Sequence, residues 1–327
     1  MNALAKNQKK KREITGTIFA NSTVILFLIL IAVVAAGSAA LPTFRNFDNI
    51  MNVFRTSPII GIVAVGATFV LITGEIDLSL GSILSLSLTL GGMCLGYSEV
   101  LGLAVTCAVG TGLGVLNGMI VAKAKISSLM VTLGASSVYS GIASILVRGK
   151  SIYLYDAPIY QWVCKGTVLK LPFPMVFFMI VSVAAALILS KTVFGHRLYY
   201  VGANPKASLY SGLPVDRIKI AAYGVCGLLT AVAGPILASQ TNRITPIIGS
   251  GYELSAISVA VLGGTILDGG KGNVLGTFVG AIVYGLLLNI LSLSGMGTYV
   301  ELVLRGVLLV GIVAVFGWIG RKQGISS

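Results

Sequence analysis

The sequence predicts an all-α, polytopic membrane bundle of about ten transmembrane helices. Of the 327 residues, 56% are hydrophobic and only 10% are charged, which leaves too little charge to cover the surface of a water-soluble protein. Apolar stretches long enough to span a bilayer recur from one end of the chain to the other. No long polar block interrupts them, so we expect residues 1–327 to form a single transmembrane domain with a cytoplasmic tail at 1–16.

Ten candidate spans follow one another along the chain. The first comes after the lysine-rich residues 6–12. Its apolar region is longer than the roughly 7–15 residues of a signal peptide, so we expect an uncleaved membrane anchor. The predicted spans are 17–40, 58–73, 79–97, 99–120, 128–147, 174–190, 220–238, 252–267, 273–292 and 298–317.

Basic residues orient these spans in the membrane. With the N-terminus inside, fifteen of the 23 lysine and arginine residues fall in inner segments and seven in outer segments, while Arg305 falls inside a span. This bias follows the positive-inside rule and places both termini in the cytoplasm. The net charge of +13 is therefore explained by topology, and we expect no nucleic-acid partner.

The stretch "ITGEIDLSLGS" at 72–82 holds two of the ten acidic residues, Glu75 and Asp77. In the middle of one continuous transmembrane helix, each carboxylate would cost about 2.5–3.5 kcal/mol on the insertion scale. A helical hairpin avoids this cost, because Gly74 can end the first helix while Asp77 or Ser79 caps the second. We therefore expect a cytoplasmic hairpin that carries Glu75, Asp77 and Ser79.

Glycines at helical spacing predict close helix packing. Gly110, Gly114 and Gly118 recur every four residues, and such a face lets two helices approach closely. Chance spacing in a chain with 41 glycines is the alternative interpretation.

Two charged residues and two asparagines inside predicted spans have a predicted role. Glu301 and Arg305 are four residues apart in the last span, so they can neutralise each other on one helix face. A structural ion pair is favoured there over a charge that contacts substrate. Asn117 and Asn289 are expected to hydrogen-bond neighbouring helices.

The longest inner connection, residues 191–219, contains a short helix whose two ends are encoded. In "NPKASLYSG", Asn204 suits the N-cap, Pro205 the first helical position, and Gly212 the position just past the end. A plain linker between two spans would not require these signals. We expect a short helix on the cytoplasmic face that another protein contacts.

Motifs for catalysis and cofactor binding are absent from the sequence. The string "DGGKGN" at 268–273 lacks the spacing and the hydroxyl of a phosphate-binding loop. The single histidine, His196, has no catalytic or zinc-binding motif around it, and the four cysteines form no C-x-x-C pair. We expect a chain that is not an enzyme, with no catalytic residue, metal or cofactor of its own.

Three strings carry a family resemblance. They are "GEIDLSLGS" in the hairpin, then "VGANPKASLYSGLPVDRIKIAAYGVCGLLTAVAGPILASQ", then "GYELSAISVAVLGGTILDGGKGNVLGTFVGA". In this order they resemble the ribose/xylose/galactoside-type ABC transporter permeases, of the branched-chain amino acid/sugar permease superfamily, from roughly residue 50 to 317. The family's usual hairpin is close to G-G-I-D-L-S-x-G-S, and the chain departs from it at Glu75, where glycine is commonest.

The resemblance implies a permease domain of vitamin B12 importer-like (type II) architecture in the cytoplasmic (inner) membrane of a bacterium. It implies a second permease subunit, identical or different, and separate ATP-binding subunits that hold ATP and magnesium. An extracytoplasmic sugar-binding protein is the usual further partner. The short helix would be the coupling helix that sits in a groove of the ATPase. Within the coupling loop 191–219, the coupling residues are then Asn204, Pro205, Lys206, Ala207, Leu209, Tyr210 and Gly212.

The function implied by the resemblance is ATP-driven import of a monosaccharide, a pentose or hexose similar to ribose. Import of a nucleoside or an autoinducer sugar by the same mechanism is the alternative. An ion-coupled secondary transporter is the alternative from another class, and the small number of intramembrane charges argues against it. The hairpins at 74–79 and 267–272 are expected on the same cytoplasmic face, as a second contact or gate.

Overall fold

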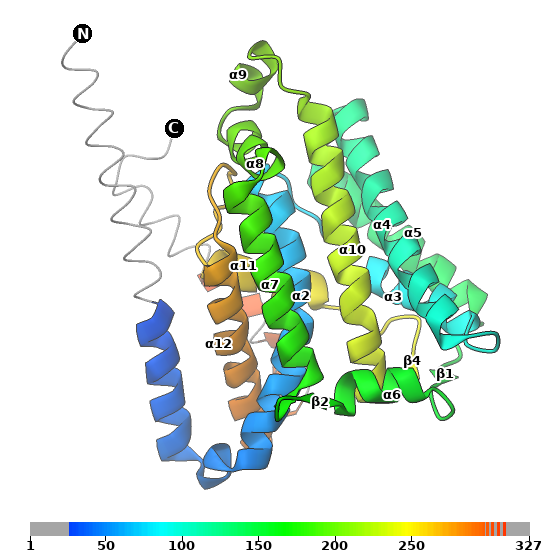
Figure 1. Cartoon of the computed structure of the whole chain (residues 1–327), viewed down its shortest axis with the longest axis vertical. Helices are drawn as coiled ribbons and strands as arrows, with labels where there is room; N and C mark the ends of the chain where they lie inside the picture. Colours follow the sequence, from blue (N-terminus) through cyan, green and yellow to red (C-terminus); the bar gives the residue numbers. More distant parts are fainter. Residues whose placement is uncertain (1–25, 298, 301, 304–305, 308–309, 312–327) are drawn as a thin grey trace.

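The secondary structure is almost entirely helical. The computed structural model describes residues 26–297 together with 299–300, 302–303, 306–307 and 310–311. Long helices run side by side between two ends, with helix α9 projecting at one end and helix α6 lying across the other (Figure 1). These are called the α9 end and the α6 end below. The predicted helical class is confirmed.

Within the described residues, six helices have the length and composition to cross a bilayer. Each overlaps one of the predicted spans, so the chain is a multi-pass membrane protein. The six are α2 (Phe47–Ile72), α4 (Glu99–Ala124), α5 (Ser128–Leu146), α7 (Phe173–Lys191), α10 (Val215–Thr241) and α12 (Val274–Leu293).

Three other predicted spans coincide with shorter apolar helices. These are Leu26–Ala40, α3 (Leu80–Met93) and α11 (Tyr252–Leu262). Helices α3 and α11 have 14 and 11 residues, whereas a helix needs about 20 to cross the hydrocarbon core. The tenth span, 298–317, lies largely outside the described residues. A total of about ten spans and the vitamin B12 importer-like architecture stay predictions.

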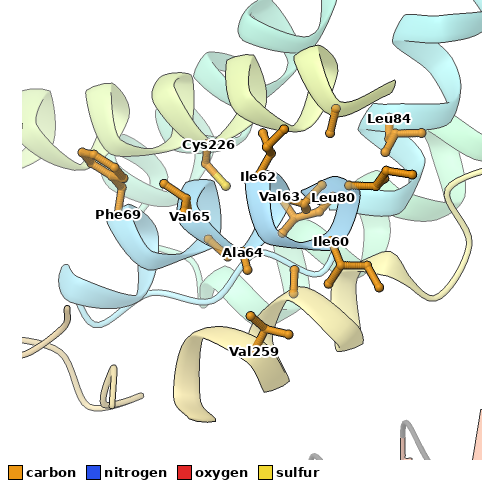
Figure 2. Close-up of a cluster of buried hydrophobic side chains, with 14 of the residues drawn as sticks. Ile60, Ile62, Val63, Ala64, Val65, Phe69, Leu80, Leu84, Cys226 and Val259 are labelled. Carbon is orange, nitrogen blue, oxygen red and sulfur yellow. The ribbon is translucent and has the colours of Figure 1, made fainter. Parts of the chain in front are cut away.

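Helix α2 is the centre of the bundle. Every residue from Ser57 to Ile72 is buried, and α7, α10, α11 and α12 pack around it. Figure 2 shows α2 between α10 and α11, with Cys226 and Val259 extending toward it from these two helices. A helix that is apolar on every face requires such surroundings. Displacing α2 would therefore displace its neighbours.

Helices α4 and α10 are in very close contact at the predicted glycine face. A Cβ atom at Gly110 would overlap Ala231, one at Gly114 would overlap the backbone of Tyr223, and one at Gly118 would crowd the side chain of Tyr223. All three glycines are buried. Their spacing thus coincides with a helix contact that tolerates no side chain on α4.

The remaining elements are short and lie at the two ends of the bundle. The α9 end has α8 (Val193–Ala203) and α9 (Pro205–Tyr210). The α6 end has the 3-10 helix η1 (Pro42–Arg45), α6 (Pro158–Lys165) and two antiparallel pairs of two-residue strands. Strand β1 (Ile152–Tyr153) pairs with β4 (Arg243–Ile244), with Ile152 opposite Ile244, and β2 (Thr167–Val168) pairs with β3 (Leu171–Pro172).

Candidate functional site

Helix α9 is a six-residue helix with a side-chain cap at its start. The Oδ1 atom of Asn204 accepts a hydrogen bond of 2.9 Å from the N–H of Ala207, and Pro205 is the first helical residue. The proline has no N–H to leave unsatisfied at this position, and its fixed φ suits the helix. Both residues occupy the positions that their chemistry predicts from the sequence.

The other end of α9 closes with a glycine. The N–H of Gly212 donates to the carbonyl of Leu209, and the N–H of Leu213 donates to the carbonyl of Ser208, each at 3.0 Å. Gly212 has φ +78°, a left-handed conformation that disfavours residues with a Cβ atom. This is a Schellman ending, so α9 is fixed at both ends.

The surface of α9 is accessible and partly apolar. Leu209 is 62% exposed and Tyr210 is 90% exposed. All seven residues predicted to couple the chain to an ATPase are exposed, whereas Ser208 is buried. Helix α9 itself lies at the tip of the α9 end (Figure 1), and its two large exposed side chains are open to solvent there.

Helix α8 precedes α9 in the chain and packs against the end of α2. Gly202 packs so closely that a Cβ atom there would overlap the carbonyl oxygen of Ile72 and crowd the backbone N of Gly270. The N–H of Gly270 donates to the same Ile72 carbonyl at 2.8 Å. Three backbone segments thus meet one helical turn or less from α9, with no side chain between them.

A second contact fixes α8 to the loop between α11 and α12. The hydroxyl of Tyr199 donates to the carbonyl of Gly272 at 2.9 Å. Burial raises the pKa of the Tyr199 phenol, so the group stays protonated and remains a donor. Helix α8 therefore joins α9 in the chain and contacts this loop through a side-chain hydrogen bond.

Residues 73–79 connect α2 to α3 without helical structure. Gly74 follows α2 with φ +78° and packs against Asp268 and Gly269, so the two predicted hairpins lie together. Glu75 forms an ion pair with Lys219 near the start of α10, and the two side chains are 15% and 16% exposed. This pair links the 73–79 segment to the helix that follows α9.

Beyond Glu75 the 73–79 segment enters the bundle instead of turning at its surface. The N–H of Ile76 donates to the hydroxyl of Ser128 at 3.2 Å, and the N–H of Leu78 donates to the hydroxyl of Thr132 at 3.1 Å. These α5 hydroxyls satisfy backbone donors that have no helix or strand partner. The sequence predicted that the whole 73–79 segment turns at the cytoplasmic surface. This prediction is corrected: Glu75 lies near the end of the bundle, whereas Ile76 and Leu78 bond to α5 inside it.

Asp77 is buried, with 3% of its surface exposed, and belongs to a polar network. Its Oδ1 atom accepts hydrogen bonds from the N–H of Ser79 at 2.8 Å and from the Ser79 hydroxyl at 2.6 Å. The Asn117 amide donates to the Ser79 hydroxyl oxygen, and the Tyr139 hydroxyl donates to Asn117, each at 2.7 Å. Ser79 sits at the N-cap of α3 but its side chain makes no cap hydrogen bond. The predicted capping by Asp77 or Ser79 is wrong, because these atoms bond one another and Asn117.

The remaining polar residues predicted in spans have different outcomes. Asn289 and Asn49 exchange two side-chain hydrogen bonds, of 2.8 and 2.9 Å, which join α12 to α2. Asn117 bonds α3 and α5 as described above. Glu301 and Arg305 lie outside the described residues, so their pairing stays a prediction.

Sequence reasoning missed the partner of Glu75 and the contact at Gly202. Lys219 is 144 residues from Glu75, and no local pattern joins them. Gly202 stands in "YVGANP" without a repeat or turn motif that marks a close backbone contact. Within the described ranges, no group of three or more His, Cys, Asp or Glu side chains is placed to hold a metal ion.

Comparison with known proteins gives consistent matches along the chain. The family model described as "Branched-chain amino acid transport system / permease component" matches residues 49–313. The chain is 38% identical to the ribose import permease protein RbsC of Bacillus subtilis (strain 168) over 286 residues, which are 86% of this chain and 89% of the relative. It is 34% identical to the L-arabinose ABC transporter permease protein AraH of Azospirillum brasilense over 302 residues, 92% and 88% of the two chains.

A more distant relative covers a similar length. The D-allose transport system permease protein AlsC of Escherichia coli (strain K12) is 27% identical over 308 residues, 93% of this chain and 94% of the relative. No solved structure matches the chain. The matched residues include the 73–79 segment, α8, α9 and the loop between α11 and α12.

Proposed function

Because the chain belongs to the branched-chain amino acid transport system / permease component family, we infer that it is the membrane-spanning permease subunit of an ATP-driven importer for a monosaccharide. The relatives are named for ribose, arabinose and allose, which are two pentoses and a hexose. A ribose-like pentose or hexose is therefore the solute class. The bilayer is the cytoplasmic membrane of a bacterium, with the α9 end facing the cytoplasm.

Helix α9 is the observation that carries the ATP-driven part of the proposal. Its caps at Asn204 and Gly212 hold Leu209 and Tyr210 in water, where burying apolar surface against a partner gains about 25 cal/mol per Å². A rigid helix with exposed anchors suits insertion into a groove of a separate ATP-binding subunit. That subunit would bind ATP with magnesium and hydrolyse the ATP, and this chain is not an enzyme.

The contacts of α8 and α10 connect α9 to the helices that would move during transport. When the ATP-binding subunits close on ATP, they push α9. The push reaches α2 and the α11–α12 loop through Gly202, Ile72 and Gly270, and it reaches the 73–79 segment through Lys219 and Glu75. Since α2 is packed on all sides, its displacement rocks the surrounding helices as rigid bodies.

Two further partners complete the importer. An extracytoplasmic sugar-binding protein delivers the solute to the α6 end, and a second permease subunit, identical or different, packs beside this one. The α6 end offers exposed aromatic residues, including Tyr155 at 67% and Trp162 at 50%. Aromatic side chains are common anchors in protein interfaces.

The test compares two exposed tyrosines at opposite ends of the bundle. Tyr210→Ala removes an anchor of α9, and Tyr97→Ala removes a side chain of matched exposure, 87%, in the turn between α3 and α4. Each variant is expressed with a candidate ATP-binding subunit from the same organism, and the co-purified ATPase is quantified. We expect Tyr210→Ala to lower the affinity for the ATPase about tenfold or more and Tyr97→Ala to leave it unchanged.

Uptake of labelled ribose, arabinose and allose into proteoliposomes tests the rest of the proposal. We expect uptake of at least one of the three sugars with ATP, the ATP-binding subunit and the binding protein present. Full-rate uptake by this chain without an ATP-binding subunit would contradict the proposal. Equal ATPase binding by the Tyr210→Ala and Tyr97→Ala variants would contradict the role of α9.

A further inference from the structure

The two carboxyl oxygens of Asp77 have different surroundings. Both hydrogen bonds from Ser79, one from its N–H and one from its hydroxyl, end at Oδ1. The Oδ2 atom is buried out of reach of water and has no hydrogen-bond partner among the described residues. All the hydrogen bonds of this carboxyl group are therefore on one oxygen.

The polar network around Asp77 leads to that same oxygen. The Tyr139 hydroxyl donates to Asn117, the Asn117 amide donates to the Ser79 hydroxyl, and the Ser79 hydroxyl donates to Oδ1 of Asp77. A hydroxyl has one proton to donate, so Ser79 has none left for Oδ2. The network therefore stabilises Oδ1 and leaves Oδ2 without a donor.

The charged and titratable groups around Asp77 supply no cation to it. Lys219 is paired with Glu75, in the one ion pair found within the described ranges. The titratable side chains that interact electrostatically with Asp77 are Tyr139 of α5 and Tyr223 and Cys226 of α10. A phenol or a thiol is neutral or negative, never positive. An ionised Asp77 would therefore be a buried charge without a counter-ion.

Asp77 also lies within the apolar part of the bundle. Cys226, with which it interacts, packs against Gly66, six residues before the end of α2. Every residue of α2 from Ser57 to Ile72 is buried. In such surroundings an unpaired charge is far more costly than an unpaired hydroxyl, so a carboxyl group takes up a proton instead of keeping its charge.

We propose that Asp77 is a proton-binding site inside the bundle, with the proton on Oδ2 at neutral pH and both bonds from Ser79 on Oδ1. In this form Oδ1 is the carbonyl oxygen of a carboxylic acid, which accepts hydrogen bonds, and Oδ2 belongs to its hydroxyl. The proton lets the 73–79 segment enter the membrane without an unpaired charge. Glu75, two residues earlier, keeps its charge because Lys219 pairs with it.

Infrared spectroscopy of the purified full chain at neutral pH tests the protonation state. A protonated carboxyl group has a carbonyl stretching band that an ionised carboxylate lacks. We expect the parent to show this band and Asp77→Asn to lose it. Glu75→Gln is the matched control, because it removes a carboxyl group two residues away that is ion-paired, and it should leave the band unchanged. Loss of carboxylate bands instead of the protonated band in Asp77→Asn would overturn the proposal.

Isotope labelling gives the same answer without any substitution. When every aspartate carries carbon-13 in its side-chain carboxyl group, we expect the protonated band of the parent to shift. The other four aspartates are exposed and lie outside the predicted spans, so water solvates their charges and Asp77 is the source of the shift. They are Asp48, Asp156, Asp216 and Asp268. A parent spectrum without a band that shifts on labelling would overturn the proposal.

Thermal unfolding in detergent supplies an independent reading. Asparagine keeps the shape of a neutral aspartic acid, with an acceptor for Ser79 and a donor in place of the hydroxyl. We therefore expect the melting temperature of Asp77→Asn to stay within about 2 °C of the parent. Glu75→Gln leaves Lys219 without its partner and should lower the melting temperature by about 3 °C or more. An equal or larger fall for Asp77→Asn would show that a charge at Asp77 stabilises the fold, and would overturn the proposal.

Discussion

Glu75 and Asp77 are two residues apart and are accommodated in different ways. Glu75 pairs with Lys219, while Asp77 is held by the N–H and hydroxyl of Ser79. A charge taken out of water requires such partners, because the lost hydration is not otherwise replaced. Lys219 lies in the second turn of a helix that begins shortly after α9. The ion pair therefore makes Glu75 a positioning residue between α10 and the 73–79 segment.

Charge reversal tests this pair. Glu75→Lys or Lys219→Glu alone places like charges together in a mostly buried site, so we expect each to lower the free energy of unfolding by about 1–3 kcal/mol. This corresponds to a fall of several degrees in the melting temperature, at about 2–4 °C per kcal/mol. The double variant restores opposite charges and should recover most of the loss. Thermal unfolding of the purified protein in detergent measures all three.

The exposed cation Lys206 supplies the control for the charge-reversal experiment. Lys206→Glu makes the same change of charge as Lys219→Glu, but at an exposed position on α9. It should leave the melting temperature within about 1 °C of the parent. A double variant no more stable than either single reversal would show that the two side chains do not depend on each other.

At the scale of elements, α9 was predictable from sequence and the half-length helices were not. The residues that begin and end α9 are Asn204, Pro205 and Gly212, and each acts on backbone groups only a few residues away. Such local signals can be recognised in the sequence. The apolar runs at 79–97 and 252–267 read as full spans, because hydropathy does not show where the backbone leaves the helix. The hydroxyls that support the 73–79 segment come from α5, more than fifty residues later along the chain.

The rigidity of α9 predicts how its end variants behave. Replacing Pro205 and Gly212 together, by glycine and valine, loosens the first turn and strains a position with φ +78°. We expect the number of sugars imported per ATP hydrolysed to fall several-fold, because a flexible helix deforms and transmits less of the ATPase movement. Misplacing a group by about 1 Å has effects of this size in enzymes. The amount of protein in the membrane should stay unchanged. Uptake and phosphate release are measured in the same proteoliposomes.

Gly96→Val is the matched control for the loosened helix. Gly96 lies in the turn between α3 and α4, with open space around the position of a Cβ atom and no positive φ. Its variant should keep the parental ratio of sugar to ATP. If the Pro205 and Gly212 variant also kept that ratio, α9 would not be the element that transmits the push.

At the scale of the whole molecule, composition was enough to predict a multi-pass helical protein, and long-range contacts decided the rest. The apolar runs identified all six long helices in the part of the chain that the structure describes. The central position of α2 follows from its lack of a polar face, but its neighbours are helices as distant in sequence as α10 and α12. The joint at Gly202, Ile72 and Gly270 brings together three loops or helix ends that no sequence period relates. Such contacts depend on tertiary packing, which a local pattern does not record.

The orientation of the whole chain is tested by two reporter fusions. A fusion after residue 205 ends in α9, and one after residue 160 ends in α6, so the two reporters emerge at opposite ends of the bundle (Figure 1). Basic residues concentrate in the 191–219 loop, with Lys191, Arg197, Lys206, Arg217 and Lys219, and positive charge is retained on the cytoplasmic side during insertion. We expect green fluorescence after 205 and alkaline phosphatase activity after 160. The reverse pattern would place α9 outside the cell, where no ATP-binding subunit can reach it, and the ATP-driven mechanism would have to be abandoned.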